Sequence, residues 1–384
     1  MPSLLVLVAV IVRFPRASEP GAVAKAPRTP LSFFPPTPVD RTKPRMTVER
    51  LLVTGATGLV GSHVAEWAIG ESIPVRALIR PGTDSRWLTE RGVEVVAGDL
   101  SLPETLAAAV AGVTHVVHSA AKVGDWGPLD GYRAVNVRGL SHLLDALAAA
   151  PLRRFVHISS LGVYEPRDHH GTDETTPPSA VGLDGYTLSK IEAEDLVLRH
   201  FRDEQLPVVV LRPGFLYGPR DRTVLPRLLG RLRRGQVRYF GSGDQLLNNT
   251  YVGNLVDAVR RALERPGIEG EVFNIRDPHL VSKRAFIGTA ARLAGFPEPR
   301  RRVPRRVAYW LAKGSEALYR GLGKSEAPLV SMARYKFLAL NLDFSIDKAK
   351  RVLGYAPPVP FEQGMQLAVD AWKAEELASH GDRT

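Results

Sequence analysis

The chain has 384 residues, a formal net charge of +11 and no cysteine. Without cysteine it can have no disulfide, no thiolate catalysis and no cysteine-liganded zinc. Its length suits one large domain or two unequal ones, and its apolar and charged fractions of 44% and 24% are those of a soluble globular protein.

The positive charge is unevenly distributed along the chain. The first 46 residues hold seven Arg or Lys against two acidic residues, and two further basic runs cover 220–238 and 300–306. Such runs suit an anionic ligand or an acidic membrane surface. Solvated helix faces explain each of these arginines, taken singly, at least as well.

Residues 1–46 do not resemble part of a folded domain. The apolar run 4–12 is too short to span a bilayer and lacks the basic residues that precede the apolar core of a signal peptide. A proline-rich stretch without helical or strand period follows it. We predict a disordered extension, or an over-long gene assignment whose true start is Met46; a signal anchor is the alternative.

The first apolar strand, 51–54, leads into a turn with three glycines at three-residue spacing. Gly55 allows a sharp turn, Gly58 lets the backbone approach a pyrophosphate, and Gly61 lets the following helix pack closely. Unpaired N–H groups and the positive end of that helix then face the phosphates. The pattern predicts a dinucleotide site with these contacts: Gly55, Thr57, Gly58, Leu59, Val60 and Gly61.

Strand and helix patterns then alternate, which indicates a parallel sheet with helices on both faces. The expected further strands are 75–79, 93–97, 115–119, 155–159, 208–211 and 271–275, and the expected helices include 62–69, 104–111 and 185–203. We predict an α/β fold: a Rossmann-type doubly wound parallel sheet of about seven strands with a smaller, mostly helical C-terminal substrate domain. The predicted cofactor domain comprises 47–211 and 251–277, the substrate domain 212–250 and 278–370, and the tail 371–384.

Ligands of open parallel sheets lie beyond the carboxyl ends of the strands. After the second strand, Arg80 stands where NAD enzymes usually carry an acid, so we favour NADP over NAD, although Asp84 keeps NAD open. Asp99 and Leu100 follow the third strand near the expected adenine edge, and a helix cap is the alternative role for Asp99. After the fourth strand, three small residues let the backbone approach the nicotinamide ribose: Ser119, Ala120 and Ala121.

Tyr186 and Lys190 are four residues apart and share one face of the predicted helix 185–203. A phenol, with a pKa near ~10, is a poor base at neutral pH unless a cation stabilises its phenolate. Lys190 can supply that charge and hold the ribose hydroxyls, while Ser160 at the end of the fifth strand can hydrogen-bond the same substrate oxygen. The Tyr-x-x-x-Lys spacing is common by itself, and it gains weight from the glycine turn and the serine that precede it.

With these motifs in this order, the chain resembles the extended short-chain dehydrogenase/reductases over roughly residues 49–370. More narrowly, it resembles the 3β-hydroxysteroid dehydrogenase and sterol-4α-carboxylate 3-dehydrogenase branch of the NAD-dependent epimerase/dehydratase superfamily. The resemblance implies that Tyr186 exchanges a proton with the substrate oxygen while hydride passes to or from the nicotinamide, and that Ser160 is catalytic. It also implies that Asn136 supports the active-site lysine through water, and that Pro213 and Phe215 pack on the nicotinamide.

The resemblance implies an oxidoreductase that interconverts a secondary alcohol and a ketone on a sterol, terpenoid or similar lipid. A nucleotide-sugar epimerase or dehydratase is the alternative, because arginines at 220, 222, 231, 233 and 234 could hold a diphosphate. A cofactor-binding regulatory protein is the non-enzyme alternative, and the complete set of Ser160, Tyr186 and Lys190 speaks against it.

We expect a small-molecule substrate, no nucleic-acid partner and a cytoplasmic protein. The segment 307–319 has apolar residues at helical period between charged ones, which predicts a helix at a membrane interface or one packed on its own domain. Peripheral membrane contact and a homodimer both remain open. His169 and His170 are expected at the surface, and we expect no metal site.

Overall fold

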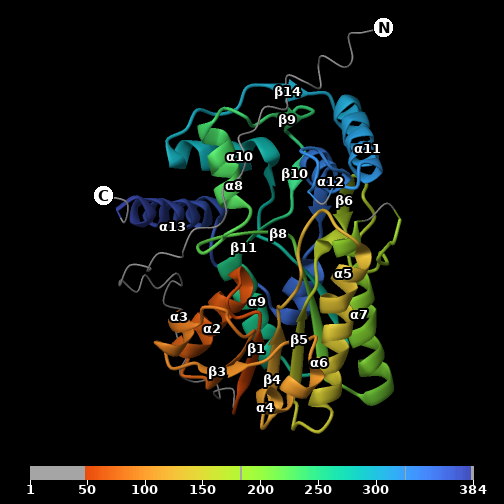
Figure 1. The fold of residues 1–384 in the computed structure, drawn as a ribbon, viewed down its shortest axis with the longest axis vertical. Helices are drawn as coiled ribbons and strands as arrows, with labels where there is room; N and C mark the ends of the chain where they lie inside the picture. Colours follow the sequence, from red (N-terminus) through yellow and green to blue (C-terminus); the bar gives the residue numbers. More distant parts are fainter. Residues whose placement is uncertain (1–47, 182–183, 325, 382–384) are drawn as a thin grey trace. The chain divides into compact units, whose positions relative to one another are not determined.

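A seven-stranded parallel sheet organises the protein (Figure 1). The computed structural model describes residues 48–181, 184–324 and 326–381, so the predicted extension 1–46 lies outside the described residues. The chain divides into a unit of residues 32–373 and a unit of residues 1–31 and 374–384. Of the second unit, the structure describes only the end of helix α13 (Phe361–Gly381).

The strand order identifies the place where a ligand should lie. From edge to edge the strands are β12 (Val272–Ile275), β7 (Val208–Pro213), β5 (Arg154–Ile158), β4 (His115–His118), β1 (Leu51–Thr54), β2 (Val75–Ile79) and β3 (Glu94–Ala97). The order reverses between β1 and β4, and such switch points are where open α/β sheets bind their ligands. The predicted fold class is confirmed; the bounds of β1 and β2 are those expected, and those of the other strands differ by one or two residues.

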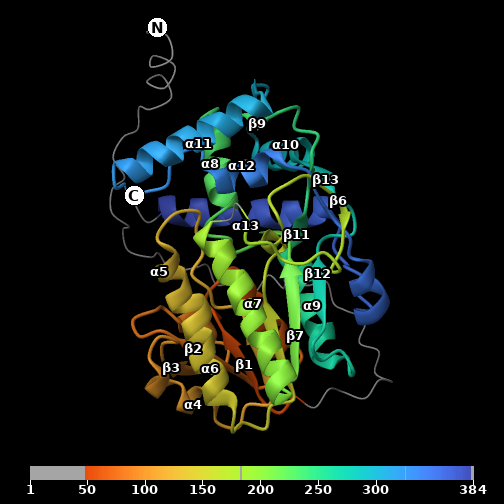
Figure 2. The same cartoon turned by 90° about the vertical axis from the view of Figure 1, so that its right-hand side faces the viewer.

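Helices cover both faces of the sheet, as the alternating sequence pattern predicts (Figure 2). Helices α2 (Leu59–Gly70) and α9 (Val252–Glu264) share a core with Leu51 and Val53 of β1. Helices α6 (Gly139–Leu147) and α7 (Gly185–Glu204) share another core with Leu52. Strand side chains alternate between the two faces, so a short buried strand serves both cores.

Shorter helices complete the connections between the strands. Helix α3 (Arg86–Thr89) precedes β3, and α5 (Leu129–Arg133) follows β4. The predicted helix 104–111 is a 3₁₀ turn (Pro103–Thr105) followed by α4 (Ala107–Val110). Its proline is at the first position of that turn, where a missing N–H costs nothing.

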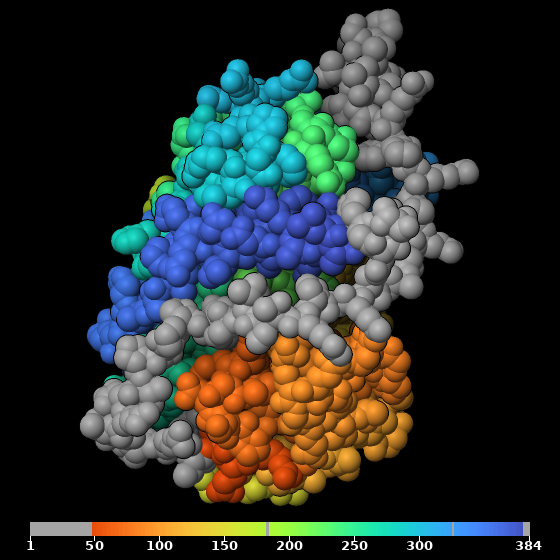
Figure 3. Space-filling view, turned by 90° about the vertical axis from the view of Figure 1, so that its left-hand side faces the viewer, coloured from red at the N-terminus to blue at the C-terminus, as the bar shows by residue number. Residues whose placement is uncertain are grey.

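A third core forms mainly between segments that follow β7. Leu229 of α8 (Leu225–Arg233), Ala290 of α10 (Lys283–Ala294) and Met365 of α13 belong to it. Figure 3 shows the green, cyan and blue surfaces of these three helices in contact on one face. Helices α11 (Arg305–Gly321) and α12 (Met332–Ala339) lie side by side in the same region (Figure 2).

Four two-stranded pairs accompany these helices. They join β6 (His169–Thr172) to β15 (Leu342–Phe344), β8 (Phe215–Tyr217) to β11 (Asn249–Tyr251), β9 (Tyr239–Phe240) to β14 (Arg302–Val303), and β10 (Leu246–Leu247) to β13 (Val281–Ser282). The proposed boundaries between a cofactor domain and a substrate domain remain a prediction. In the described part of the chain, no helix has both the length and the apolar character to cross a membrane.

Candidate active site

The glycine turn after β1 has the conformation that its sequence predicts. Gly55 has a φ of +71°, and a Cβ on it would lie 2.8 Å from the main-chain nitrogen of Ala120. A Cβ on Gly61 would overlap the carbonyl oxygen of Gly55. Both positions therefore exclude side chains, and the exposed Gly58 begins α2, whose first N–H groups lack partners within the helix. The other predicted contacts lie in the same turn: Thr57, Leu59 and Val60.

The residues after β4 lie against this turn. The hydroxyl of Ser119 donates a 2.8 Å hydrogen bond to the carbonyl of Thr54, and the N–H of Ala120 donates a 3.3 Å bond to the Thr54 hydroxyl. Ser119 thus uses its side chain to hold β4 beside β1. Ala120 and Ala121 are half-buried at the mouth of the turn, where small side chains leave the backbone accessible.

Positive groups gather beyond the end of β2. Arg80 is exposed there. Asp84, the acid that kept NAD open, forms a 2.6 Å ion pair with Arg86, whose hydrogen bonds lower the pKa of Asp84 to about 2. The charge of Arg222 also lowers the pKa of this carboxyl. Asp84, the acid nearest to Arg80 in the sequence, therefore already forms an ion pair with another cation.

Asp99 and Leu100 occupy different environments after β3. The hydroxyl and N–H of Ser101 donate hydrogen bonds of 2.7 and 2.8 Å to Asp99, and these lower its pKa, with the charge of Arg80 adding to the effect. Asp99 therefore stabilises the turn at Ser101 and does not cap the helical turn Pro103–Thr105, whose N-cap residue Leu102 has no side-chain cap. The alternative role expected for Asp99 as a helix cap is wrong, because its carboxylate is bonded to Ser101. Leu100 is buried and packs against Gly139, where a Cβ would lie 2.9 Å from the Cβ of Leu100.

The end of β5 lies against the start of α7: Ser160 lies near its first turn, and Lys190, one turn further along the helix, bonds the last residue of β5. The hydroxyl of Ser160 accepts a 3.0 Å hydrogen bond from the N–H of Gly162. A Cβ on Gly162 would lie 3.1 Å from that hydroxyl and 3.8 Å from the side chain of Thr187, the neighbour of Tyr186. The buried ammonium of Lys190 donates a 2.8 Å hydrogen bond to the carbonyl of Ile158, the last residue of β5.

The electrostatics of this site favour a protonated phenol. Burial raises the pKa of Tyr186 above its usual range, and the nearby Asp184 carboxylate raises it further. Burial also lowers the pKa of Lys190 to about 8, against the opposing influence of Glu194. The ammonium of Lys190 is hydrogen-bonded to the carbonyl of Ile158. Stabilisation of the Tyr186 phenolate by Lys190 stays a prediction.

Asn136 links the β4 loop to the catalytic helix. It lies in a π-helical turn (Ala134–Arg138), a distortion that is frequent at functional sites. Its amide accepts a 2.7 Å hydrogen bond from the N–H of Lys122 and donates a 2.9 Å bond to the hydroxyl of Ser189. Ser189 in turn donates a 2.7 Å bond to the carbonyl of Tyr186. Support of Lys190 by Asn136 through water stays a prediction.

A buried ion pair that the sequence analysis missed lies behind these residues. Arg212 donates hydrogen bonds of about 3.0 Å to Glu194, one helical turn after Lys190, and 2.8 Å to the hydroxyl of Tyr164. Ser159 donates a 2.7 Å bond to the same carboxylate. The network ties β5 and β7 to α7. Only the placement of Glu194 four residues after Lys190, on the same helix face, could have indicated it.

Two stacked histidines lie near Lys190. The rings of His118 and His157 are 5.6 Å apart, and both side chains are buried. Burial lowers the pKa of His118 to about 3 and that of His157 well below its usual value, and the charge of Lys190 contributes to both shifts. The pair is therefore neutral at physiological pH.

The segment after β7 brings an aromatic side chain to the site. Pro213 ends β7 and Phe215 begins β8. The ring of Phe215 lies 4.1 Å from that of Phe337 and 5.5 Å from that of Phe286. Phe337 comes from α12, so the predicted cofactor-side residue contacts the substrate side of the chain.

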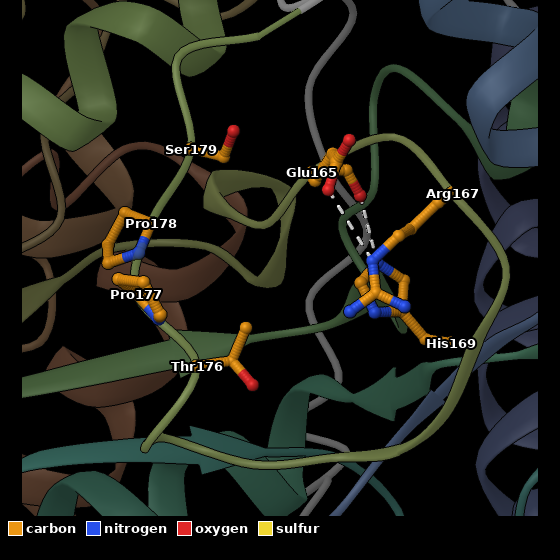
Figure 4. Close-up of a pocket in the computed structure, with 7 residues that line it drawn as sticks. All are labelled: Glu165, Arg167, His169, Thr176, Pro177, Pro178 and Ser179. Carbon is orange, nitrogen blue, oxygen red and sulfur yellow. Dashed lines mark hydrogen bonds and ion pairs between the residues drawn. The ribbon is translucent and has the colours of Figure 1, made fainter.

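A pocket of about 360 Å³ is lined by residues that follow Tyr164 in the chain, none of which is a predicted site residue (Figure 4). Its lining comprises Glu165, Arg167, His169, Thr176, Pro177, Pro178 and Ser179. His170 is exposed, as expected, but the expectation of a surface position is wrong for His169, which is buried. Its ring nitrogens are hydrogen-bonded to the carbonyl of Glu165 at 2.9 Å and to Thr172 at 3.0 Å. The described residues include no group of three or more His, Asp or Glu side chains that could hold a metal ion.

Comparison with known proteins identifies the family. The model of the NAD dependent epimerase/dehydratase family matches residues 51–275. The chain belongs to this family. The 2-alkyl-3-oxoalkanoate reductase of Shewanella oneidensis is 32% identical to it over 333 residues, which are 83% of this chain and 85% of the relative. The decarboxylating sterol-4α-carboxylate 3-dehydrogenase of Candida albicans is 29% identical over 350 residues, 86% of this chain and 99% of the relative.

Solved structures agree with this assignment. The crystal structure of gox2253 has a TM-score of 0.72 and 32% identity, and covers 86% of this chain and 98% of its own. A UDP-glucuronic acid 4-epimerase from Bacillus cereus in complex with NAD has a TM-score of 0.67 and 25% identity, over 84% and 96%. The family, with its named reductases and dehydrogenases, confirms the prediction of a nicotinamide-dependent enzyme that acts on CH–OH groups.

Proposed function

We propose that this enzyme reduces a ketone of a lipid-like substrate to a secondary alcohol, with Tyr186 as the proton donor. The observation that carries the proposal is the meeting of Ser160, Lys190 and the first turn of α7 at the end of β5. Ser160 holds the substrate oxygen, Tyr186 gives it a proton, and Lys190 holds the ribose hydroxyls. The bound nicotinamide supplies the hydride.

The protonation state of Tyr186 suits it to donate a proton to the substrate oxygen during reduction. Burial and Asp184 both raise the pKa of its phenol, so it carries the proton that an incipient alkoxide needs. In the reverse direction the same group must accept a proton as phenolate. A raised pKa makes that phenolate scarcer at neutral pH, because only the deprotonated form can act as the base.

The glycine turn fits a dinucleotide, since side chains are excluded at Gly55 and Gly61 and the first N–H groups of α2, which follow its N-cap Gly58, point out of the helix. Within that fit we propose NADP as the preferred form. Arg80 is exposed beyond β2, where the 2′-phosphate is expected, and Asp84 is paired with Arg86. Because Asp84 is already paired with Arg86, its carboxylate is less available to accept a hydrogen bond from the ribose 2′-hydroxyl of NAD.

Apolar side chains and two relatives support a lipid-like substrate. Phe215, Phe286 and Phe337 form a contiguous aromatic group beside the predicted nicotinamide position. The names of the two relatives specify a 2-alkyl-3-oxoalkanoate and a sterol-4α-carboxylate. We therefore propose a ketone or alcohol carried on an extended apolar skeleton.

A nucleotide-sugar substrate remains the competing proposal. Of the arginines that could hold a diphosphate, Arg220 forms a 2.7 Å ion pair with Glu66 and stacks on Trp87. Arg231 is half-buried, and burial lowers its pKa, with Arg334 contributing. It is therefore the member of the run best placed to receive an anion.

A substrate screen separates these functions. The protein is mixed with sterols, terpenoid alcohols, 3-oxo esters or UDP-sugars, together with each nicotinamide cofactor, and the absorbance of the reduced nicotinamide is followed. Because an epimerase returns its cofactor to the starting redox state, the products of the UDP-sugar reactions are also separated by chromatography. We expect turnover of lipid ketones with NADPH. Conversion of UDP-sugars without turnover of any lipid would overturn the proposal in favour of the epimerase, and cofactor binding without any turnover would favour the regulatory protein.

We further propose that helix α11 places this cytoplasmic protein on an anionic membrane surface. Trp310, Leu318 and Leu322, on the helix and at its C-terminal end, are 67%, 54% and 61% exposed. The exposed cations Arg306 and Lys313 lie on the same helix. Aromatic and aliphatic side chains next to cations are typical of helices that lie in a bilayer interface.

Vesicle sedimentation tests the membrane proposal. We expect binding to phosphatidylcholine vesicles that contain phosphatidylglycerol, and loss of binding in a Trp310→Ser, Leu318→Ser double variant. Val181→Ser removes an equally exposed apolar side chain elsewhere and serves as the control. A concentration-dependent dimer that this double variant abolishes, without vesicle binding, would instead assign the surface to a homodimer.

A further inference from the structure

Helix α12 touches three parts of the predicted active site. Arg334 forms a 2.6 Å ion pair with Asp125, in the loop that follows β4. The ring of Phe337 lies 4.1 Å from that of Phe215, beside the predicted nicotinamide position. Between them, Lys336 reaches the turn that follows β5. One short helix therefore brings an ammonium, a guanidinium and an aromatic ring to the substrate side of the site.

The ammonium of Lys336 lies close to the predicted catalytic serine. It donates hydrogen bonds of 2.6 Å to the carbonyl of Gly162 and 3.3 Å to that of Tyr164. The N–H of Gly162 donates to the hydroxyl of Ser160 at 3.0 Å. An ammonium has three donors, so two main-chain acceptors leave one for a ligand.

The surroundings of Lys336 leave its charge poorly balanced. Asp184 is the acid whose charge acts on it, and both oxygens of that carboxylate accept 3.2 Å hydrogen bonds from Thr187 at the start of α7. Burial outweighs this acid and lowers the pKa of Lys336 to about 8. The charge of Lys336 also helps to lower the pKa of His169. An anion that binds here stabilises the ammonium.

We propose that Lys336 binds a substrate carboxylate attached to the carbon next to the reacting one, so that the substrates are 3-oxo acids and 3-hydroxy acids. The identity of the reacting carbon rests on the proposed function, whereas the cation and its neighbours do not. Lys336 and Ser160 both bond the main chain of Gly162, which places the acid group on the same turn as the predicted catalytic serine. A single ammonium matches a carboxylate, whereas a phosphate dianion is better matched by guanidinium forks.

Equilibrium binding tests this site without relying on turnover. The protein loaded with reduced cofactor cannot oxidise an alcohol, so calorimetric titration with 3-hydroxydecanoate and with its methyl ester compares binding alone. We expect the wild type to bind the acid at least about tenfold more tightly than the ester, as a charge-assisted hydrogen bond implies. Lys336→Met should bring this ratio near one, and Lys336→Arg should retain part of it. Lys350→Met, the same change at an exposed lysine, should keep the wild-type ratio.

Equal affinities of the wild type for acid and ester, no binding of either, or an undiminished ratio in Lys336→Met would each overturn the proposal. A merely structural tie between Lys336 and Gly162 would lower both affinities together and leave the ratio unchanged. Kinetic assays of 3-oxodecanoate and its methyl ester with reduced cofactor report separately on the proposed function. A carboxylate preference in binding without reduction of any ketone would overturn the proposed function and leave the Lys336 site standing.

Discussion

The ammonium of Lys190 donates a 2.8 Å hydrogen bond to the main-chain carbonyl of Ile158, which joins helix α7 to the end of β5. We expect Lys190→Met to weaken cofactor binding about 10- to 150-fold, the usual value of a hydrogen bond to a charged group, and to slow turnover as well. Calorimetric titration and steady-state kinetics measure the two effects. A variant with wild-type cofactor affinity would contradict the role of Lys190 at the ribose.

The same lysine should make cofactor affinity depend on pH. Burial lowers its pKa to about 8, so the ammonium is present below pH 8 and is lost as the pH rises through that value. We expect the affinity of the wild type to fall above pH 8 and that of Lys190→Met to lack this fall. An identical pH profile in the two proteins would show that another group is responsible.

Tyr186→Phe should remove most turnover and leave cofactor affinity nearly unchanged. A general acid contributes about 10²- to 10⁴-fold, and phenylalanine keeps the ring but not the proton. Tyr132→Phe is the matched control, because its ring is only 6.4 Å away while its hydroxyl binds the carbonyl of Trp126. If Tyr186→Phe kept more than a third of wild-type turnover, with chemistry limiting the rate, Tyr186 would not be the proton donor.

Arg80→Asp should reverse the cofactor preference. A guanidinium can bind the 2′-phosphate of NADP through two hydrogen bonds, and such contacts contribute about 1.5 to 3 kcal/mol. We expect NADP affinity to fall at least about tenfold and NAD affinity to improve, since the new carboxylate can accept a bond from the 2′-hydroxyl. Titration of both cofactors decides the matter: equal affinities in the wild type, or an unchanged ratio in the variant, would contradict it.

Glu194→Gln should destabilise the fold strongly. The side chains of Glu194 and Arg212 are 3% and 4% exposed, and removing one partner of a buried pair typically costs about 3 to 5 kcal/mol because a charge stays buried without compensation. Urea unfolding measures the loss. Asp195→Asn breaks an exposed pair with Arg199 on the same helix and should cost little. Equal losses in the two variants would mean that Glu194 and Arg212 contribute no more than a surface pair.

Acid should destabilise the protein partly through its buried histidines. The folded pKa of His118 is about 3, whereas an unfolded histidine titrates near 6.5, so the unfolded state binds more protons and stability is lost as the pH falls below about 6.5. His157 shifts in the same direction. We expect His157→Gln to show a shallower loss of melting temperature between pH 7 and 5, and exposed His279→Gln to follow the wild type. Parallel curves for all three proteins would contradict this.

Local physical chemistry explains how much of the fold was predictable. Gly55 and Gly61 predict a tight turn, because only glycine tolerates the backbone conformation of the first and the close packing at the second. The apolar run of β1 indicates a strand buried on both faces. These signals act within one turn or one strand. The spacing of Tyr186 and Lys190 is equally local, since both lie on one turn of α7.

Tertiary structure decided the contacts between distant segments. Lys336 meets Gly162 across 174 positions, Arg212 meets Glu194 across 18, and Asn136 meets Ser189 across 53. No local period relates such residues, because their proximity depends on how β5, α7 and α12 cross in space. The sequence by itself thus determined the sheet, the glycine turn and the Tyr-Lys pair. Only the packing of separate elements decided which charges lie buried beside them, because burial and partner, rather than residue type, set the energy of a charged group.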